Sequence, residues 1–269
     1  MSPNTFTPKL VLIFLHLYCH TLLTSSVSES IECIPSEYDA LLRVKHHLVD
    51  ITNRLSSWNV SNPNCCTWDY VVCSNITAHV LQLHLDSSID AFGHIDFPTD
   101  VLAYERYMYS GEINDSLLEL KHLNYLNLSG NEDMQIPTFI FAITSLTHLD
   151  LSLAGFIGEI PYQIGNLSNF YLDLSYGVYG KLPHQIGNLT NLILLGLRSP
   201  LVVENTQWLS GLTSLEYLDL SGADLSKSFD WLHTMQALPS LQGLRLLDCI
   251  MGDDYAQPSK LNFSYLCIL

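Results

Sequence analysis

The sequence predicts an α/β solenoid: a right-handed coil of repeated units with a parallel β-sheet on its concave face and a helical, disulfide-linked cap at its N-terminus. Two observations indicate this fold, a fixed repeat of leucine pairs and a group of four cysteines near the front of the chain. Five pairs follow one another every 23 residues and a sixth follows after 26: Leu126/Leu128, Leu149/Leu151, Leu172/Leu174, Leu195/Leu197, Leu218/Leu220 and Leu244/Leu246. A period of this length is typical of a solenoid, whose units bury their apolar faces only against their neighbours.

Residues 1–28 have the composition of a secretory signal peptide. Lys9 precedes an apolar stretch that runs from Leu10 to Leu23, and Ser26 and Ser28 are small residues suited to a cleavage site. The apolar stretch is short for a membrane span, so we favour a cleaved signal over an uncleaved amphipathic anchor. The sequence therefore predicts a protein of the secretory pathway.

The composition excludes some partners. The formal net charge is −16, only 14% of the residues are charged, and the Lys and Arg residues form no cluster. A surface for nucleic acid or for an anionic membrane needs such a cluster, so we expect neither partner. The hydrophobic content of 48% is sufficient for a core.

Residues 29–79 are predicted to form the cap, which opens with a helix. Pro35 and Ser36 precede an apolar stripe at helical spacing, and Asp39 follows Ser36 by three residues. This spacing predicts that Ser36 caps the helix and that Asp39 completes a capping box.

Four cysteines lie in the same segment: Cys33, Cys65, Cys66 and Cys73. In an exported chain such a group indicates a disulfide framework. A bond within the adjacent pair would strain the intervening peptide, which leaves two possible connectivities. The alternative of a metal site is weak because no histidine stands at ligand spacing beside the group. We expect no metal and no cofactor.

Residues 80–269 are predicted to form the solenoid. Val80 to Leu85 alternate in polarity and predict its first strand, residues 86–110 read as an irregular inserted loop, and the repeats dominate from Gly111 onward. Because alternate residues of a strand face the same side, Leu126 and Leu128 are predicted to point inward and stack with their counterparts in the other units.

The outward neighbours of the strand leucines are the candidate ligand-binding residues: Tyr125, His148, Asp150, Tyr171, Asp173, Tyr217, Asp219 and Arg245. Exposed aromatic residues in register are common at interfaces. The aspartate column could also suggest acid chemistry, but a solvated face of the repeat is the better interpretation. No Ser-His-Asp arrangement, phosphate loop or kinase signature stands out, so we expect no catalytic residues and no enzyme.

Seven Asn-x-Ser/Thr sequons are candidate glycan sites in an exported chain: Asn59, Asn75, Asn114, Asn127, Asn166, Asn188 and Asn262. Asn59 and Asn75 are the favoured sites because they lie in the polar front segment. Asn166 and Asn188 occupy matching points of the repeat, so the fold itself can favour asparagine there.

The segments Gln163–Leu167 and Gln185–Leu189, both Gln-Ile-Gly-Asn-Leu, resemble the end of the plant-type extracellular leucine-rich repeat. The front segment, with Ser57-Trp58 and its cysteine pattern, is similar to the N-terminal cap of the same family. The resemblance covers most of residues 32–269 and implies the pairing Cys33–Cys65 and Cys66–Cys73.

Three features depart from the family's pattern. The turn asparagine, Asn131 in the first unit, is replaced in the later units by Ala154, Gly177, Pro200, Ala223 and Cys249. Phe170 and Leu172 stand two residues apart where the pattern has three, which predicts a missing residue. Residues 261–269 read as an incomplete last repeat whose strand does not arrive, so we expect a truncated product or an incomplete gene model.

The resemblance implies the ligand-recognition ectodomain of a plant leucine-rich repeat receptor-like protein, active in defence or development. It implies a protein or peptide ligand, a membrane receptor kinase as co-receptor, and an extracellular, apoplastic or cell-surface location. Membrane anchorage is expected only if the full-length chain continues past Leu269. The alternatives are a secreted inhibitor of microbial cell-wall-degrading enzymes and a nonfunctional receptor fragment.

Overall fold

The computed structural model describes residues 32–87, 107–131, 134–135, 137–154, 159–168, 170–252 and 267–268. The predicted signal peptide, residues 88–106 of the predicted loop, and Asn262 lie outside the described residues. Within the described part, no helix combines the length and the apolar character needed to cross a membrane.

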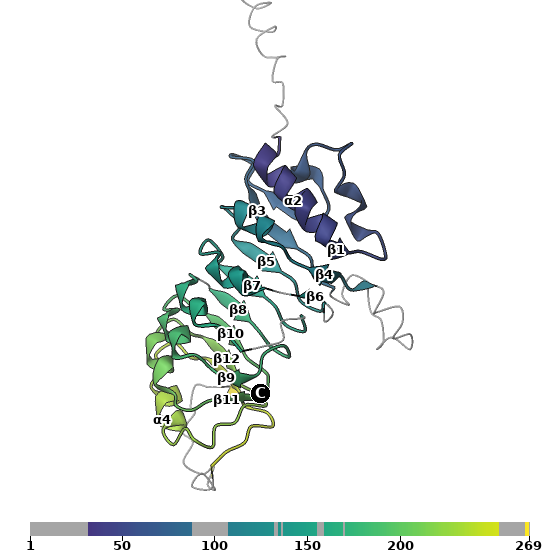
Figure 1. Cartoon of the computed structure of the whole chain (residues 1–269). Coiled ribbons are helices and arrows are strands. Elements are labelled where there is room, and N and C mark those ends of the chain that lie inside the picture. The colour runs from purple at the N-terminus through teal and green to yellow at the C-terminus, as the bar shows by residue number, and fades with distance from the viewer. Residues whose placement is uncertain are drawn as a thin grey trace, which may run out of the picture. The chain divides into compact units, whose positions relative to one another are not determined.

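The main sheet runs through the unit formed by residues 32–269 and has nine strands among the described residues (Figure 1). In spatial order they are β14 (Cys267–Ile268), β13 (Gly243–Arg245), β12 (Tyr217–Asp219), β10 (Leu194–Gly196), β8 (Tyr171–Asp173), β7 (His148–Asp150), β5 (Tyr125–Asn127), β3 (Val80–His84) and β2 (Val71–Cys73). All neighbours are parallel except β2 and β3, which are antiparallel. The fold is the predicted leucine-rich repeat solenoid.

The leucine pairs form the core, as predicted. The first members of the pairs are register partners from strand to strand: Leu126, Leu149, Leu172, Leu195, Leu218 and Leu244. Each of these six leucines is at most 2% exposed. Burial of a leucine contributes about 1.5–3 kcal/mol, so this continuous spine stabilises every coil it passes through. Leu246, in the last pair, is only half-buried.

Short 3₁₀-helices complete the coils: η4 (Asp115–Glu119), η5 (Thr138–Ala142), η6 (Tyr162–Asn166), η7 (His184–Asn188) and η8 (Gln207–Gly211). Glycines in η7 and η8 allow these helices to stack closely. A Cβ atom on Gly187 would stand 2.5 Å from the carbonyl oxygen of Trp208, and one on Gly211 would stand 2.0 Å from that of Gly187. The helix α4 (Trp231–Gln236) follows in the next coil.

Smaller strands lie beside the main sheet. The strands β1 (Leu48–Val49), β4 (Ser110–Glu112) and β6 (Met134–Gln135) form one sheet, and β9 (Gly180–Lys181) pairs with β11 (Leu201–Val202). Ser110 therefore belongs to a strand and not to the predicted loop.

The cap begins with the helix α2 (Pro35–His47), and the predicted capping box is wrong. Pro35 occupies the first turn and Ile34 the N-cap position, which makes no side-chain capping bond. Proline has a φ angle suited to the start of a helix and no N–H to satisfy, so the helix begins before Ser36 can act as a cap. Two 3₁₀-helices follow, η1 (Arg54–Ser57) and η2 (Cys65–Thr67).

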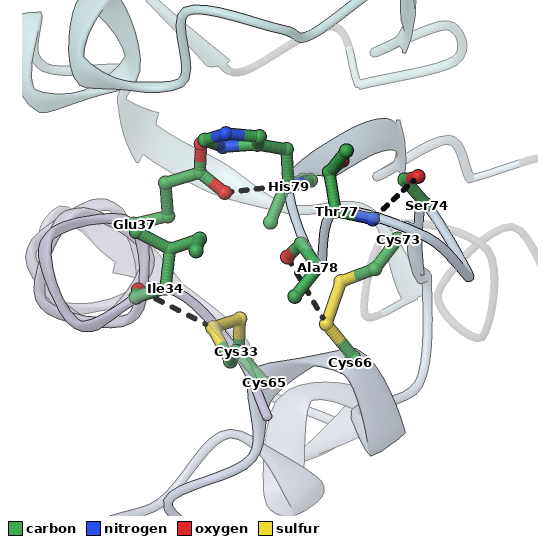
Figure 2. Close-up of polar contacts among 11 residues, drawn as sticks. Cys33, Ile34, Glu37, Cys65, Cys66, Cys73, Ser74, Thr77, Ala78 and His79 are labelled. Atoms are coloured by element: carbon green, nitrogen blue, oxygen red, sulfur yellow. Dashed lines mark hydrogen bonds and ion pairs between the residues drawn. A yellow bond between two sulfur atoms is a disulfide. The ribbon is translucent and has the colours of Figure 1, made fainter. Parts of the chain in front are cut away.

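Two disulfides link the cap, Cys33–Cys65 and Cys66–Cys73, in the pairing that the family resemblance implies (Figure 2). The sulfur atoms of Cys33, Cys65 and Cys66 lie within 4.8 Å of one another. A metal ligand must be a thiolate, so disulfide-bonded sulfurs of this kind do not form a metal site.

A buried carboxylate joins the cap helix to the solenoid. Glu37 is 2% exposed, and its Oε2 accepts the backbone N–H of Val80 at 2.7 Å. Its Oε1 lies 2.9 Å from Nδ1 of His79. Since Val80 begins β3, this carboxylate fixes α2 against the first strand of the sheet.

A guanidinium holds the two described ends of the predicted loop 86–110. Arg54 donates hydrogen bonds to the carbonyl oxygens of Asp86 at 2.7 Å and Tyr107 at 3.3 Å. It also lies over the ring of Tyr109, with 4.4 Å to the centroid. Arg54 of the cap therefore contacts both described ends of this segment.

Asn131 satisfies the backbone of its turn, as expected from the repeat. The side chain is fully buried and donates to the carbonyl oxygens of Leu85 at 2.6 Å and Leu128 at 2.9 Å. Its Oδ1 accepts the N–H of Tyr109 at 2.8 Å.

One sequence prediction about the repeat is confirmed and another is wrong. The approach to β8 is one residue short, as predicted: four residues separate η6 from β8, whereas five separate η5 from β7 and η7 from β10, although Tyr171 remains the register partner of His148. Phe170 takes the position of Thr147 in the preceding unit, and its carbonyl oxygen accepts hydrogen bonds from the next unit. The last strand does arrive: Cys267–Ile268 pairs with β13, and Ile268 is the partner of Leu244. An interval of 24 residues between these partners is close to the usual period, so isoleucine takes the position of the strand leucine.

Candidate ligand-binding face

The outward residues of the main sheet form two columns on the face that the sequence predicts to be concave, which we call the outer face. The first column consists of Gln82, Tyr125, His148, Tyr171, Leu194, Tyr217 and Gly243. The second consists of His84, Asn127, Asp150, Asp173, Gly196, Asp219 and Arg245. All eight candidate residues lie in these columns because the register is unbroken.

Four rings make a continuous stack over β3, β5, β7 and β8, which we call the ring stack. The ring centroids of His84 and Tyr125 are 4.5 Å apart, those of Tyr125 and His148 are 4.1 Å apart, and those of His148 and Tyr171 are 4.0 Å apart. Parallel strands stand about 4.8 Å apart, so aromatic side chains in register come into face contact. His84 was not among the predicted residues, although it is an outward residue of the first strand.

Burial keeps the ring stack uncharged near neutral pH. Desolvation and, to a smaller extent, repulsion from His84 lower the pKa of His148 to about 4. Burial also lowers the pKa of His84, partly offset by attraction to Asp86. Burial raises the pKa of the Tyr125 and Tyr171 phenols. The stack is therefore a neutral aromatic surface.

The aspartates of the second column stabilise the turns that follow their strands. The Oδ1 atoms of Asp150, Asp173 and Asp219 each accept a backbone N–H at 2.9 Å, from Ser152, Ser175 and Ser221 respectively. Such turns hold the side chain on the outer face, which agrees with a repeat position better than with acid chemistry.

The pKa of Asp150 differs from that of an ordinary aspartate. The pKa of its carboxyl is raised to about 6, mainly by burial and also by repulsion from Asp173 and Asp86, against the opposing effect of the hydrogen bonds from Ser152. The carboxyl of Asp150 therefore becomes protonated at a higher pH than an ordinary aspartate.

A hollow of about 520 Å³ opens on the outer face over β8, β10, β12 and β13. Its walls and floor are formed by Tyr171, Asp173, Ser175, Leu194, Leu195, Gly196, Tyr217, Leu218, Asp219, Gln242, Gly243, Leu244 and Arg245. Five of these residues, Tyr171, Asp173, Tyr217, Asp219 and Arg245, are among the predicted candidates.

Two glycines create this hollow. A Cβ atom on Gly196 would stand 2.5 Å from Oδ1 of Asp173, and one on Gly243 would stand 2.7 Å from Cδ1 of Tyr217. The Asp173 and Tyr217 side chains therefore lie over the neighbouring glycines. Because each glycine removes one side chain from a column, the surface sinks where the register would otherwise place a ring or a carboxylate.

One cation lines the hollow. Nη1 of Arg245 lies 3.8 Å from Oδ2 of Asp219, and both side chains are partly exposed. An exposed ion pair at this distance contributes little. The arrangement offers aromatic faces, two carboxylates and a guanidinium, which are groups suited to binding a polar ligand.

The sequons differ in how their amides are used. The side chains of Asn75, Asn166 and Asn188 are exposed. Asn114 donates to the carbonyl oxygen of Arg43 at 3.2 Å, and Asn127 accepts the N–H of Ser129 at 2.9 Å, as the aspartates of its column do.

The sequon at Asn127 therefore arises from a repeat position of the sheet. Asn59, one of the two favoured sites, is half-buried and donates to the carbonyl oxygens of Ser56 and Ser57. Glycan occupancy stays a prediction at all seven sequons.

Comparisons with known proteins agree with this fold. Residues 34–74 match the leucine rich repeat N-terminal domain. The chain is 33% identical over 247 residues to receptor-like protein EIX1 of Solanum lycopersicum, an alignment that covers 87% of this chain and 21% of that protein. It is 31% identical over 111 residues to polygalacturonase inhibitor 1 of Oryza sativa subsp. japonica, covering 38% of this chain and 32% of the inhibitor. The chain thus spans about a fifth of the length of EIX1.

Among solved structures, the chain is similar to the Arabidopsis receptor kinase HAESA in complex with the peptide hormone IDA and the co-receptor SERK1. The TM-score is 0.56 at 21% identity, with 80% of this chain and 38% of that chain covered. At this identity the likeness concerns the fold.

Proposed function

We propose that this chain, a leucine-rich repeat protein of the plant receptor-like class, recognises a peptide ligand outside the cell through the outer face of its sheet. The hollow beside the ring stack is the observation that supports this proposal. Its volume of about 520 Å³ lies within the ~300–1,000 Å³ of typical ligand pockets. The leucine spine below keeps the face preformed, which reduces the entropy lost on binding.

The proposed ligand is a peptide because an extended chain can cross several parallel strands and place successive side chains against the two columns. HAESA, which has the same fold, is recorded with a peptide hormone. The same complex contains a co-receptor kinase, and we propose a membrane receptor kinase as the signalling partner of this chain. The proposed location is the apoplast or the outer surface of the plasma membrane.

The second candidate function is inhibition of a microbial cell-wall-degrading enzyme. The similarity to the rice polygalacturonase inhibitor favours this alternative. Addition of the purified chain to a fungal polygalacturonase tests it, and a dose-dependent loss of activity would favour inhibition over peptide recognition.

A library of random seven-residue peptides, displayed on beads, tests the proposed function with the full secreted chain. Tyr171→Ala and Tyr217→Ala remove the aromatic walls of the hollow and are expected to reduce capture of the selected peptides about tenfold or more. The matched control is Tyr162→Ala, since Tyr162 lies in η6 away from the main sheet and is 65% exposed. Equal losses in all three variants, or no selective capture by the unaltered chain, would contradict the proposal.

A further inference from the structure

We infer that the hollow on the outer face binds a positively charged side chain of the ligand, with arginine preferred over lysine. This inference rests on the proposed function, because it names the chemistry of the peptide that the face recognises. It concerns the part of the hollow between Asp219 and Asp173, whose carboxylate lies over Gly196.

Two carboxylates flank this part of the hollow. Asp173 and Asp219 are register neighbours of Gly196 on either side, so their backbones stand about 10 Å apart, which is twice the strand spacing. Each carboxylate uses Oδ1 to accept the N–H of its turn serine, which fixes the direction of the second oxygen. The Asp173 carboxylate lies over Gly196, so a cationic group in the hollow between Asp173 and Asp219 would meet two oriented acceptors.

The charge of the hollow is negative. Its lining contains Asp173 and Asp219 against the single guanidinium of Arg245, which reaches Asp219 only at 3.8 Å. A second cation can bind without displacing a strong ion pair. The formal net charge of −16 for the whole chain adds a long-range attraction for basic peptides.

Tyrosine rings provide surfaces that suit a guanidinium. One face of the Tyr171 ring packs on His148 with 4.0 Å between centroids, so its other face is directed along the sheet toward β10 and the hollow. Tyr217, on the far side of β10, is 46% exposed. Cations are attracted to aromatic faces, and a planar guanidinium can stack on a ring while it donates two parallel hydrogen bonds to a carboxylate. An ammonium group cannot do both, and this is why arginine is preferred.

A neutral sugar is the competing ligand, because tyrosine faces and carboxylates also bind sugar rings. A sugar would use the carboxylates as hydrogen-bond acceptors, and its binding would depend little on their charge or on salt. The excess of carboxylates over cations in the hollow favours the basic peptide.

The test uses Asp173→Asn and Asp219→Asn, separately and together, in the full chain. Asparagine keeps the Oδ1 acceptor of the turn and removes only the charge. Both substitutions create Asn-Leu-Ser sequons, so all proteins are prepared from bacterial periplasm, where disulfides form and these sequons stay unmodified. Asp224→Asn is the matched control, because Asp224 makes the same turn with Ser226 at 2.9 Å but does not line the hollow.

The probes are the bead-displayed seven-residue peptides. Among the captured peptides we expect enrichment of arginine and, less strongly, of lysine. Each single variant is expected to bind a selected arginine peptide about tenfold more weakly than the unaltered chain, and Asp224→Asn is expected to bind it equally well. Replacement of the arginine of the peptide by glutamine should cause a similar loss, and added salt should weaken binding.

The other outcomes separate this inference from the proposed function. Selective capture of peptides without basic enrichment, lost in Tyr171→Ala but kept in the double asparagine variant, would overturn the inference and leave peptide recognition intact. Binding of neutral plant oligosaccharides that is insensitive to salt and to both substitutions would also overturn it, in favour of a sugar site. Absence of selective capture by the unaltered chain would overturn both.

Discussion

The two halves of the outer face share one backbone and differ in what stands on it. Over β3, β5, β7 and β8, the ring stack fills the surface with four ring side chains, of which Tyr125, His148 and Tyr171 stack face to face and His84 packs on Tyr125 at a tilt. Over β10, β12 and β13, Gly196 and Gly243 interrupt the columns, and the surface sinks into the hollow. The strand register is identical in both halves. The comparison indicates that side-chain volume, and not the path of the chain, decides where the outer face is hollowed.

The largest expected effect concerns the leucine spine, which lies beneath both halves of the outer face. Leu149 lies under the ring stack and Leu195 under the hollow, and both are fully buried. Leu149→Ala and Leu195→Ala should each lower the free energy of unfolding by about 2–5 kcal/mol, because each leaves a cavity in the spine. Urea denaturation measures the change.

Leu194→Ala is the control for these substitutions, since Leu194 is an outward neighbour on the same strand and is only half-buried. It should cost less than about 1 kcal/mol. A urea midpoint unchanged by Leu149→Ala would disprove the register on which both halves depend.

The ring stack and the hollow should respond differently to loss of an aromatic side chain. His148→Ala removes two stacked contacts, to Tyr125 and Tyr171, and should cost about 1–3 kcal/mol. Tyr217→Ala should cost less than about 1 kcal/mol, because Tyr217 is 46% exposed and belongs to the wall of the hollow. A double-mutant cycle between Tyr125→Ala and His148→Ala isolates the stacking energy. Equal costs for His148→Ala and Tyr217→Ala would remove the distinction between the halves.

Two residues of β7, Asp150 and His148, are expected to have opposing pH effects on stability. The pKa of Asp150 is about 6 in the folded state and 3.8 ordinarily, so its contribution is present below pH 3.8 and is lost as the pH rises through 6. The pKa of His148 is about 4 in the folded state and 6.5 ordinarily, so its contribution is present above pH 6.5 and is lost as the pH falls through 4. Between pH 4 and 6 the two contributions partly cancel.

Single substitutions should reveal each contribution in thermal melts of protein from bacterial periplasm. Asp150→Asn should gain stability relative to the unaltered chain as the pH rises from 4 to 6, and His148→Phe should lose it over the same range. Parallel curves of melting temperature against pH for all three proteins would show that burial does not shift the pKa values of Asp150 and His148.

The smallest expected effect is at the floor of the hollow. Gly196→Ala places a methyl group against the carboxylate of Asp173, which makes room only by shifting its hydrogen bond with the N–H of Ser175. The cost should be about 1 kcal/mol, while the hollow becomes smaller. Gly211→Ala is the contrasting control, because its methyl group would meet the backbone oxygen of Gly187 at 2.0 Å and should destabilise the helix stack more. Equal melting temperatures for the two variants would contradict this difference.

The sequence predicted the spine and the membership of the two columns well, since both depend only on local periodicity. It also predicted the shortened approach to β8, but it missed the last strand. Phe170 was aligned with buried leucines, although it follows that position by one residue. Ile268 was not predicted as a strand residue because the pattern of the repeat consists of leucines, and isoleucine takes the place of one here. Ser36 was predicted to cap the helix, but the helix already begins at Pro35.

The sequence by itself determined which residues of this protein point inward and which point outward, because alternation along a strand and a 23-residue period are properties of the chain alone. Only the tertiary structure decided that His84, Tyr125, His148 and Tyr171 close into one stack, and that Asp173 and Tyr217 lie over glycines and leave a hollow. The physical reason is that these contacts join residues of different coils. Their geometry depends on strand spacing, side-chain rotamers and the volume of each neighbour, which exist only once the coils are stacked.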